Sequence, residues 1–153
     1  MLHQLLKIKN IREQAAETEV RKCKNRIEIA KKEVRQKQQE FEEYVDWRGK
    51  EEKRLYDNII NTEVHQNDLS HLKKKIALMR EKDVTLEQAV AEAEKKVIDE
   101  EQALEQAKKV HTKAIQAVEK FAEFTKVQDA EAKKDAERLE DLEMEEFTVK
   151  PKF

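Results

Sequence analysis

The chain has 153 residues, of which 43% are charged and only one each is Gly, Pro and Cys. Turns depend on Gly and Pro, so this composition argues against sheet proteins, loop-built enzymes, P-loop domains and disulfide scaffolds. The 32 basic residues nearly balance the 34 acidic ones, which favours long helices and coiled coil over disorder.

The first predicted helix covers about residues 2–61 and carries apolar residues at alternating intervals of three and four. Such spacing is typical of a coiled-coil seam. An apolar face also continues upstream to the N-terminus. The ladder contains Ala16, Val20, Cys23, Ile27, Ala30, Val34, Phe41, Tyr44 and Leu55, with polar Lys37, Arg48 and Glu51 in the same phase.

The connection between the helices is predicted at residues 61–67, because turn and cap residues cluster around this stretch. Asn67 or Asp68 would serve as the N-cap of the next helix. A rival break lies at residues 83–85, where Thr85 and Gln88 have capping-box spacing. The ladder runs through 83–86 in phase, which favours the earlier connection. The second helix would then extend about 20 residues, roughly 30 Å, beyond the first.

The second predicted helix covers about residues 67–146 and continues the same repeat from Leu69 to Glu146. Two long helices with one short connection predict an all-α antiparallel coiled-coil hairpin, a single unit over residues 1–147, with the second helix longer. Residues 148–153, which include Pro151, are predicted to form a disordered tail. Small seam residues would let the helices approach closely, and they are Ala16, Ala30, Ala93, Ala107, Ala114 and Ala132.

The two ends of the chain carry opposite charge. Residues 1–37 contain eleven Lys and Arg against five Asp and Glu, whereas residues 129–146 contain three against nine. Five glutamates interrupt the basic stretch, so a solvated helix face is favoured there over a nucleic-acid or membrane-surface site. No run approaches the roughly 18 apolar residues of a transmembrane segment. The single Cys23 forms no intramolecular disulfide, which favours a reducing, cytoplasmic setting.

Residues that could support catalysis are present without the spacing that catalysis needs. The four histidines are far apart, and none lies four residues from another His or from Cys, so no zinc motif is indicated. The paired carboxylates would lie on solvated helix faces, where nothing shifts their pKa values. We therefore expect no enzyme activity, no cofactor and no metal, and we interpret His111 as a tolerated polar residue of the seam.

A cluster of aromatic and basic residues before the connection is the best candidate for a partner site. Trp, Tyr and Arg dominate the energetics of protein interfaces, and the cluster comprises Tyr44, Trp47, Arg48, Arg54, Leu55 and Tyr56. Tyr44 lies on the seam and is expected to pack, whereas Trp47, Arg54 and Tyr56 lie off it. The alternative is that Trp47 simply covers the seam. Gly49 costs about 1 kcal/mol relative to Ala in a helix interior, so we expect a kink or a close backbone contact there.

These residues also carry a family resemblance. The stretch Tyr44-x-x-Trp47-Arg48-x-x-Glu51-Glu52-x-Arg54-Leu55-Tyr56-Asp57, followed by Ile76-Ala77-Leu78-Met79-Arg80-Glu81-Lys82, resembles the YscO family of type III secretion proteins. The start, Leu2-x-x-Leu5-Leu6-x-Ile8-Lys9-x-x-Arg12-Glu13, is also similar. The family's flagellar counterpart is FliJ, and both are similar in shape to the stalk of the rotary ATPase γ subunit.

The resemblance implies a non-enzymatic, monomeric stalk in the bacterial cytoplasm, associated peripherally with the secretion apparatus at the inner membrane. Its paired ends would enter the hexameric secretion ATPase, with contacts from Leu5, Ile8, Arg12, Leu139 and Leu142. The region near the connection would face the export gate, and the protein would escort chaperones of translocator or needle subunits. The alternative is a structural coiled-coil protein that associates with itself.

Overall fold

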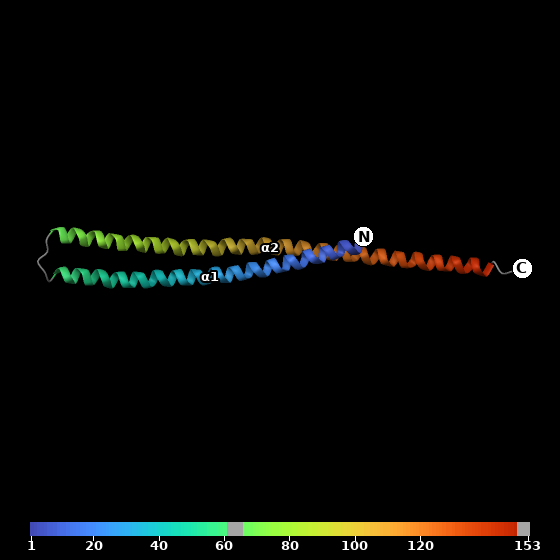
Figure 1. Cartoon of the computed structure of the whole chain (residues 1–153), viewed down its shortest axis with the longest axis horizontal. Coiled ribbons are helices and arrows are strands. Elements are labelled where there is room, and N and C mark those ends of the chain that lie inside the picture. The colour runs from blue at the N-terminus through green and yellow to red at the C-terminus, as the bar shows by residue number, and fades with distance from the viewer. Residues whose placement is uncertain (61–65, 150–153) are drawn as a thin grey trace. The chain divides into compact units, whose positions relative to one another are not determined.

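The structure is a computed structural model that describes residues 1–60 and 66–149, nearly all of them in two α-helices (Figure 1). Helix α1 spans Leu2–Ile60 and helix α2 spans Gln66–Val149, with lengths of 59 and 84 residues. The described residues contain no strand. The all-α fold with a longer second helix is therefore confirmed. Neither helix, over the same residues, has a stretch apolar and long enough to cross a membrane.

The break between the helices falls where the turn chemistry predicted it. Residues 61–65, most of the predicted connection, lie outside the described residues. Helix α2 already begins at Gln66, so Asn67 and Asp68 belong to its first turn and the N-cap assignment was wrong. The carboxylate of Asp68 still stabilises the first turn of α2, because the N-terminal end of the helix dipole is positive.

The rival break at residues 83–85 is wrong, because α2 is continuous through it. The hydroxyl of Thr85 donates a hydrogen bond to the backbone oxygen of Glu81 at 3.2 Å. This bond lies within the helix and is the opposite of capping, in which the side chain accepts a bond from a following N–H group.

The chain divides into two compact units. The connection unit contains residues 22–105, and the terminal unit contains residues 1–21 and 106–153. In the connection unit α1 and α2 are antiparallel, since Glu33, Arg48 and Glu52 pair with Lys96, Asp83 and Arg80 respectively. Its buried apolar residues follow the predicted ladders: Cys23, Ile27 and Ala30 from α1, and Leu72, Ile76, Met79, Val90 and Ala93 from α2.

In the terminal unit the start of α1 packs antiparallel against the middle of α2. His3 lies 3.0 Å from Asp129, and Glu13 lies 2.8 Å from His111. The buried residues of this unit are Ala16, Val20, Ala107 and Thr125. Among the other seam alanines, Ala30 and Ala93 are buried, Ala114 is half-buried and Ala132 is exposed.

Beyond Thr125 the second helix has no buried residue as far as Phe147, the last residue whose burial is described. Every residue from Lys126 to Phe147 is exposed, because α1 reaches α2 only as far as the contact between His3 and Asp129. Figure 1 shows α2 continuing past the N-terminus without a neighbouring helix. The helix ends at Val149, so Thr148 and Val149 are helical although they were assigned to the tail. Residues 150–153 lie outside the described residues.

Candidate functional site

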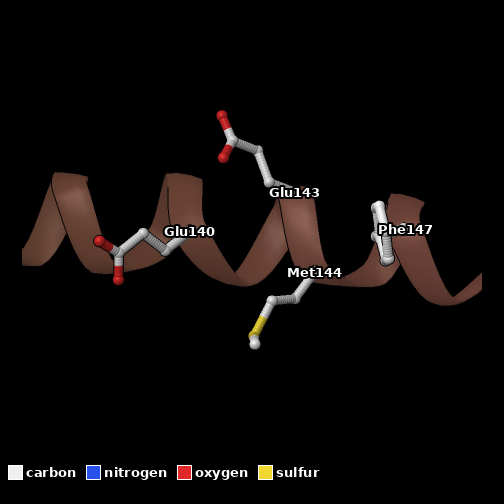
Figure 2. A pocket seen from close by; sticks show the side chains of 4 residues that line it. All are labelled: Glu140, Glu143, Met144 and Phe147. Atoms are coloured by element: carbon white, nitrogen blue, oxygen red, sulfur yellow. The ribbon is translucent and has the colours of Figure 1, made fainter.

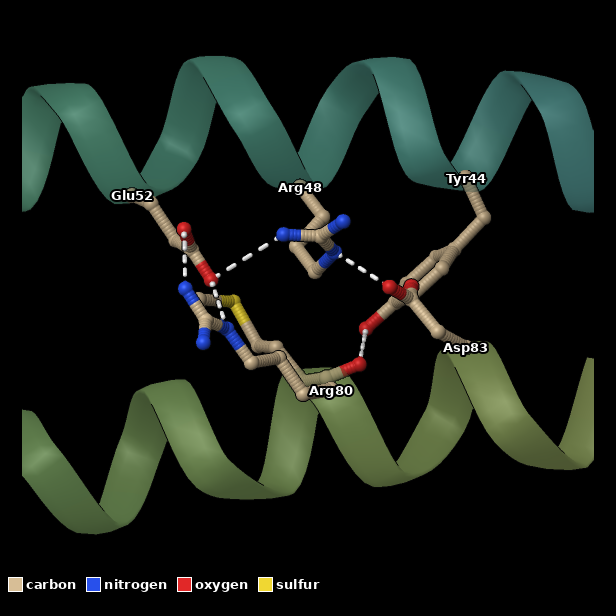
Figure 3. Close-up of polar contacts among 6 residues, drawn as sticks. Tyr44, Arg48, Glu52, Arg80 and Asp83 are labelled. Carbon is tan, nitrogen blue, oxygen red and sulfur yellow. Dashed lines mark hydrogen bonds and ion pairs between the residues drawn. The ribbon is translucent and has the colours of Figure 1, made fainter.

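A layer of polar side chains crosses the seam of the connection unit. Tyr44, Arg48 and Glu52 are spaced four apart on α1, so they share one face of the helix, and Figure 3 shows all three directed toward α2. Arg48 Nε lies 2.6 Å from Asp83 Oδ2, and Arg48 Nη1 donates to Glu52 Oε1 at 3.2 Å. The side chains of Arg48 and Asp83 are each only 18% exposed. We call Tyr44, Arg48, Glu52, Arg80 and Asp83 the polar layer.

The remaining contacts of the polar layer bind the helices to each other. Arg80 donates to Glu52 through Nε at 3.2 Å and through Nη2 at 3.5 Å. The hydroxyl of Tyr44 donates to the backbone oxygen of Met79 at 3.1 Å. The Oδ1 atom of Asp83 is buried and accepts no hydrogen bond from the described residues. The side chains of Tyr44 and Arg80 each form a hydrogen bond to the opposite helix and therefore favour one register between α1 and α2.

The electrostatics of the polar layer follow from these contacts. The hydrogen bond from Arg80 lowers the pKa of Glu52, and Arg48 adds to this effect against the opposing effect of burial. The same bond raises the pKa of Arg80. Burial raises the pKa of Tyr44, and the negative charge of Asp83 raises it further. These shifts favour the charged forms of Glu52 and Arg80 and the neutral phenol of Tyr44.

The predicted partner cluster separates into inward and outward residues. Tyr44 and Arg48 use their polar atoms inside the polar layer. Leu55 packs against the buried cluster of Leu72, Ile76 and Met79. By contrast Trp47, Tyr56 and the side chain of Arg54 are 51%, 49% and 58% exposed.

The exposed residues of this cluster lie on two sides of the seam. Trp47 and Arg54 are seven residues apart and share a helix face, whereas Tyr56 is nine residues from Trp47, about half a turn around α1. The Trp47 ring lies 5.6 Å from the Tyr44 ring, over which Lys82 of α2 places its Nζ at 4.9 Å. We call Trp47, Arg54, Lys82 and the ring of Tyr44 the Trp47 face. Tyr56 is not part of it.

Arg54 is held in place on the Trp47 face by a neighbouring carboxylate. Its Nη2 lies 2.5 Å from Glu51 Oε1, and its Nε lies 3.1 Å from Glu51 Oε2. This two-bond contact lowers the pKa of Glu51 and raises the pKa of Arg54. Glu51 therefore orients the guanidinium on the face of α1 that also carries Trp47, about two helical turns away.

Gly49 serves no packing purpose within the described chain. It lies inside α1 and has an ordinary negative φ. A Cβ atom built on it would meet nothing within 4 Å. The close backbone contact expected at Gly49 is thus absent from the described chain, and that position of α1 faces solvent.

In the terminal unit the residues predicted for ATPase contact form two separate surfaces. Leu5 and Ile8 are 39% and 44% exposed, and with Arg12 they share one flank of α1. A groove beside them is lined mainly by alanines and basic residues, among them Lys9, Arg12, Ala15, Ala16, Ala114, Ala117 and Lys113.

Leu139 and Leu142 lie farther along α2, beyond the contact of His3 with Asp129. They are 61% and 53% exposed and continue the seam phase of α2 where α1 no longer accompanies it. Met144 and Phe147 form a second apolar pair on another face and are 70% and 79% exposed, with Glu140 and Glu143 nearby (Figure 2). We call residues 130–147 the seam extension.

Comparison with known proteins decides the family. The family model described as type III secretion protein YscO matches residues 2–150. The chain belongs to the YscO family of type III secretion proteins. It is 27% identical to the Yop proteins translocation protein O of Yersinia pseudotuberculosis over 129 residues, which are 84% of each protein. The crystal structure of the type III secretion protein YscO from Vibrio parahaemolyticus matches with a TM-score of 0.91 and 31% identity, over 96% of this chain and 92% of that one.

Several residues of this YscO-family chain were missed by sequence reasoning. Glu52 and Arg80 lie beside the seam phase and gave no periodic signal, and Met144 and Phe147 lie outside the phase of the ladder. Asp83 lies in the ladder, within the stretch of the rival break, and was assigned no role from the sequence. The available signal for this pair was a basic residue, Arg48, in the first ladder and an acidic residue, Asp83, in the second. Pairing them required the exact register between the two helices.

Proposed function

We propose that this YscO-family chain is a non-enzymatic stalk of the type III export apparatus. The terminal unit binds the hexameric secretion ATPase, and the connection unit contacts the export gate and the chaperones of translocator or needle subunits. The protein works in the bacterial cytoplasm, peripherally attached to the apparatus at the inner membrane, and links ATP turnover to the gate without chemistry of its own.

The seam extension is the observation that carries this proposal. An amphipathic helix gains most of its stability by burying its apolar stripe, yet here the stripe continues through Leu139 and Leu142 without α1 beside it. Residues 129–146 also carry nine acidic against three basic side chains. A partner that covers the apolar stripe and presents basic groups complements both properties, and the interior of an ATPase ring offers such an enclosing surface.

The flank formed by Leu5, Ile8 and Arg12 supplies a second contact of opposite charge. Its groove is lined in part by Lys9, Arg12 and Lys113, so it favours acidic groups of a partner. Two surfaces of opposite charge in one unit support an asymmetric interaction with a ring.

The test uses the purified full chain and the purified secretion ATPase from the same bacterium. We expect binding and stimulation of ATP hydrolysis by the wild type, and loss of both in Leu139→Ala/Leu142→Ala. Leu78→Ala is the matched control, because Leu78 is also exposed, at 64%, but lies in the connection unit. Equal stimulation by all three proteins, or none by the wild type, would overturn the assignment of the seam extension.

The Trp47 face supports the proposed contact with the gate or a chaperone. Trp47 is half exposed, and Arg54 is oriented by Glu51, so both offer preorganised interface groups. We expect Trp47→Ala and Arg54→Ala to reduce secretion while helicity and melting stay nearly unchanged. Lys53→Ala, an exposed residue on the outer side of α1, is the control. If Trp47→Ala lowered the melting temperature while the folded variant still supported normal secretion, Trp47 would be a packing residue and not a partner contact.

We further propose that the free chain is a monomer, because α1 and α2 of the same chain pack against each other in each unit and bury the seam as far as Thr125. The competing function is a structural protein that self-associates, and the exposed stripe of the seam extension is the feature that favours it. Light scattering with size-exclusion chromatography separates the two. A concentration-independent monomer mass supports the stalk, and a stable dimer that Leu139→Ala/Leu142→Ala dissociates supports self-association.

A further inference from the structure

Three metal-ligating side chains meet across the two helices of the terminal unit. Glu13 and Glu17 are four residues apart on α1, and His111 faces them from α2. One ligand atom from each lies within 4.8 Å of the other two. The helix repeat places the carboxylates one above the other, on the face that packs against α2.

This cluster is partly enclosed and already preoriented. The side chains of Glu13 and His111 are only 23% and 22% exposed, and His111 Nε2 lies 2.8 Å from Glu13 Oε1. Glu17 accepts a hydrogen bond from Arg21 Nη2 at 2.7 Å through Oε1. A carboxylate has two oxygens with several lone pairs, so this contact leaves Glu17 with capacity for another ligand bond.

We propose that Glu13, Glu17 and His111 form a binding site for a transition-metal dication of the Zn²⁺ class, which clips α1 to α2. This inference goes beyond the proposed function and does not depend on it. An imidazole with two carboxylates suits Zn²⁺ and its neighbours, whereas Ca²⁺ and Mg²⁺ prefer an all-oxygen shell. A water molecule would complete four-coordination.

The geometry is compatible with this ligand set. Zn–N and Zn–O bonds of about 2.0–2.2 Å place ligand atoms of a tetrahedral site about 3.3 Å from one another. The distance of 2.8 Å from His111 to Glu13 and the 4.8 Å limit for all three lie on either side of that value. Small rotamer adjustments therefore bring the three atoms onto one ion. Sequence spacing gave no signal, because the ligands come from two helices nearly a hundred residues apart.

The test is calorimetric titration of the full chain with Zn²⁺, joined by the visible absorption of Co²⁺ as a coordination probe. We expect one ion per chain, a tetrahedral Co²⁺ spectrum and a melting temperature that rises with Zn²⁺ concentration, since a ligand of the folded state stabilises it. His111→Gln and Glu17→Gln are each expected to weaken binding by more than about tenfold, because even outer-shell partners of metal sites contribute about 10–100-fold.

Glu17→Gln separates a metal site from a simple hydrogen bond, because the bond between His111 and Glu13 does not involve Glu17. His71→Gln removes an exposed histidine of the other unit and is the control, expected to bind as the wild type does. Circular dichroism verifies that each variant is folded. Weak binding of several ions that is equal in all four proteins, or an octahedral Co²⁺ spectrum in the wild type, would overturn the proposal.

Discussion

The same repeat of apolar residues has opposite outcomes in two regions of α2. Between Leu72 and Ala93 the ladder is buried against α1, and a charged pair of Arg48 with Asp83 interrupts it. In the seam extension the ladder continues in phase through Leu139 and Leu142, and every residue there is exposed. Periodicity thus predicts which residues a helix offers for burial, whereas the length of the partner helix decides which are buried.

The charges of the two regions differ in the same way. In the polar layer acidic and basic side chains neutralise each other across the seam at short distances. In the seam extension acidic residues outnumber basic ones without an opposing helix. The charges of the polar layer are therefore balanced within the connection unit, while the seam extension has both apolar and acidic side chains exposed.

The largest effect is expected from breaking the charged pair. Arg48→Ala leaves the carboxylate of Asp83 largely buried without its partner, which costs on the order of 3 kcal/mol of unfolding free energy. Lys50→Ala removes an exposed pair with Asp46 and should cost no more than about 0.5 kcal/mol. Urea denaturation measures both.

The double variant Arg48→Met/Asp83→Leu is the complement to this experiment. Replacing both charges with apolar groups removes the burial penalty along with the attraction, so the stability should return to near the wild-type value. If Arg48→Ala proved as mild as Lys50→Ala, the polar layer would be a solvated surface contact rather than part of the seam.

The next largest effect on the unfolding free energy is expected from truncating a buried apolar residue, which we compare with an exposed one in the seam extension. Ile76→Ala empties a position that is 7% exposed and should cost about 2 kcal/mol, at the low end for buried sites because a two-helix interface collapses readily. Leu142→Ala in the seam extension should leave the unfolding free energy almost unchanged. Similar losses at both positions would mean that the seam extension is packed in the free protein.

Gly49→Ala is expected to stabilise the protein by about 1 kcal/mol, which is the helix-propensity difference between the two residues. The added methyl group meets nothing within 4 Å in the chain. Thermal and urea unfolding measure the gain. A loss of stability would show that α1 deviates from regular helix geometry at Gly49, and weaker binding to the gate or a chaperone would place a partner backbone there.

A smaller effect should appear in the pH dependence of stability. Arg80 and Arg48 lower the pKa of Glu52 in the folded state, so this carboxylate stabilises the fold above its unfolded pKa of about 4.3. That contribution is lost as the pH falls through the lower folded value. The stability difference between the wild type and Glu52→Gln should therefore shrink between pH 6 and pH 3, in urea unfolding series at fixed ionic strength. A constant difference over this range would refute the role of the ionised carboxylate.

The sequence predicted most of the fold because the fold depends on periodicity and turn chemistry. The ladders identified the buried residues Ile27 and Ile76, and the cluster of cap residues located the break before Gln66. Predicting the site was harder, because the neighbours of a side chain depend on interhelical register. The sequence grouped Trp47 with Tyr56, but the helix turn places them on opposite flanks.

The same limit applies to contacts between distant segments. Glu13 and His111 carry no sequence relation that indicates their contact, and Arg80 lies off the seam although it binds Glu52. Each depends on long side chains reaching across two helices whose register a one-dimensional pattern does not specify.

Hydrogen exchange of the full chain, alone and with the secretion ATPase, tests the central claim most directly. In the free protein we expect rapid exchange over residues 130–147 and slow exchange over residues 72–93, because only the latter helix segment is packed. Addition of the ATPase should protect residues 130–147 and leave residues 72–93 unchanged. Protection of residues 130–147 in the free chain, or no change there when the ATPase binds, would contradict the account.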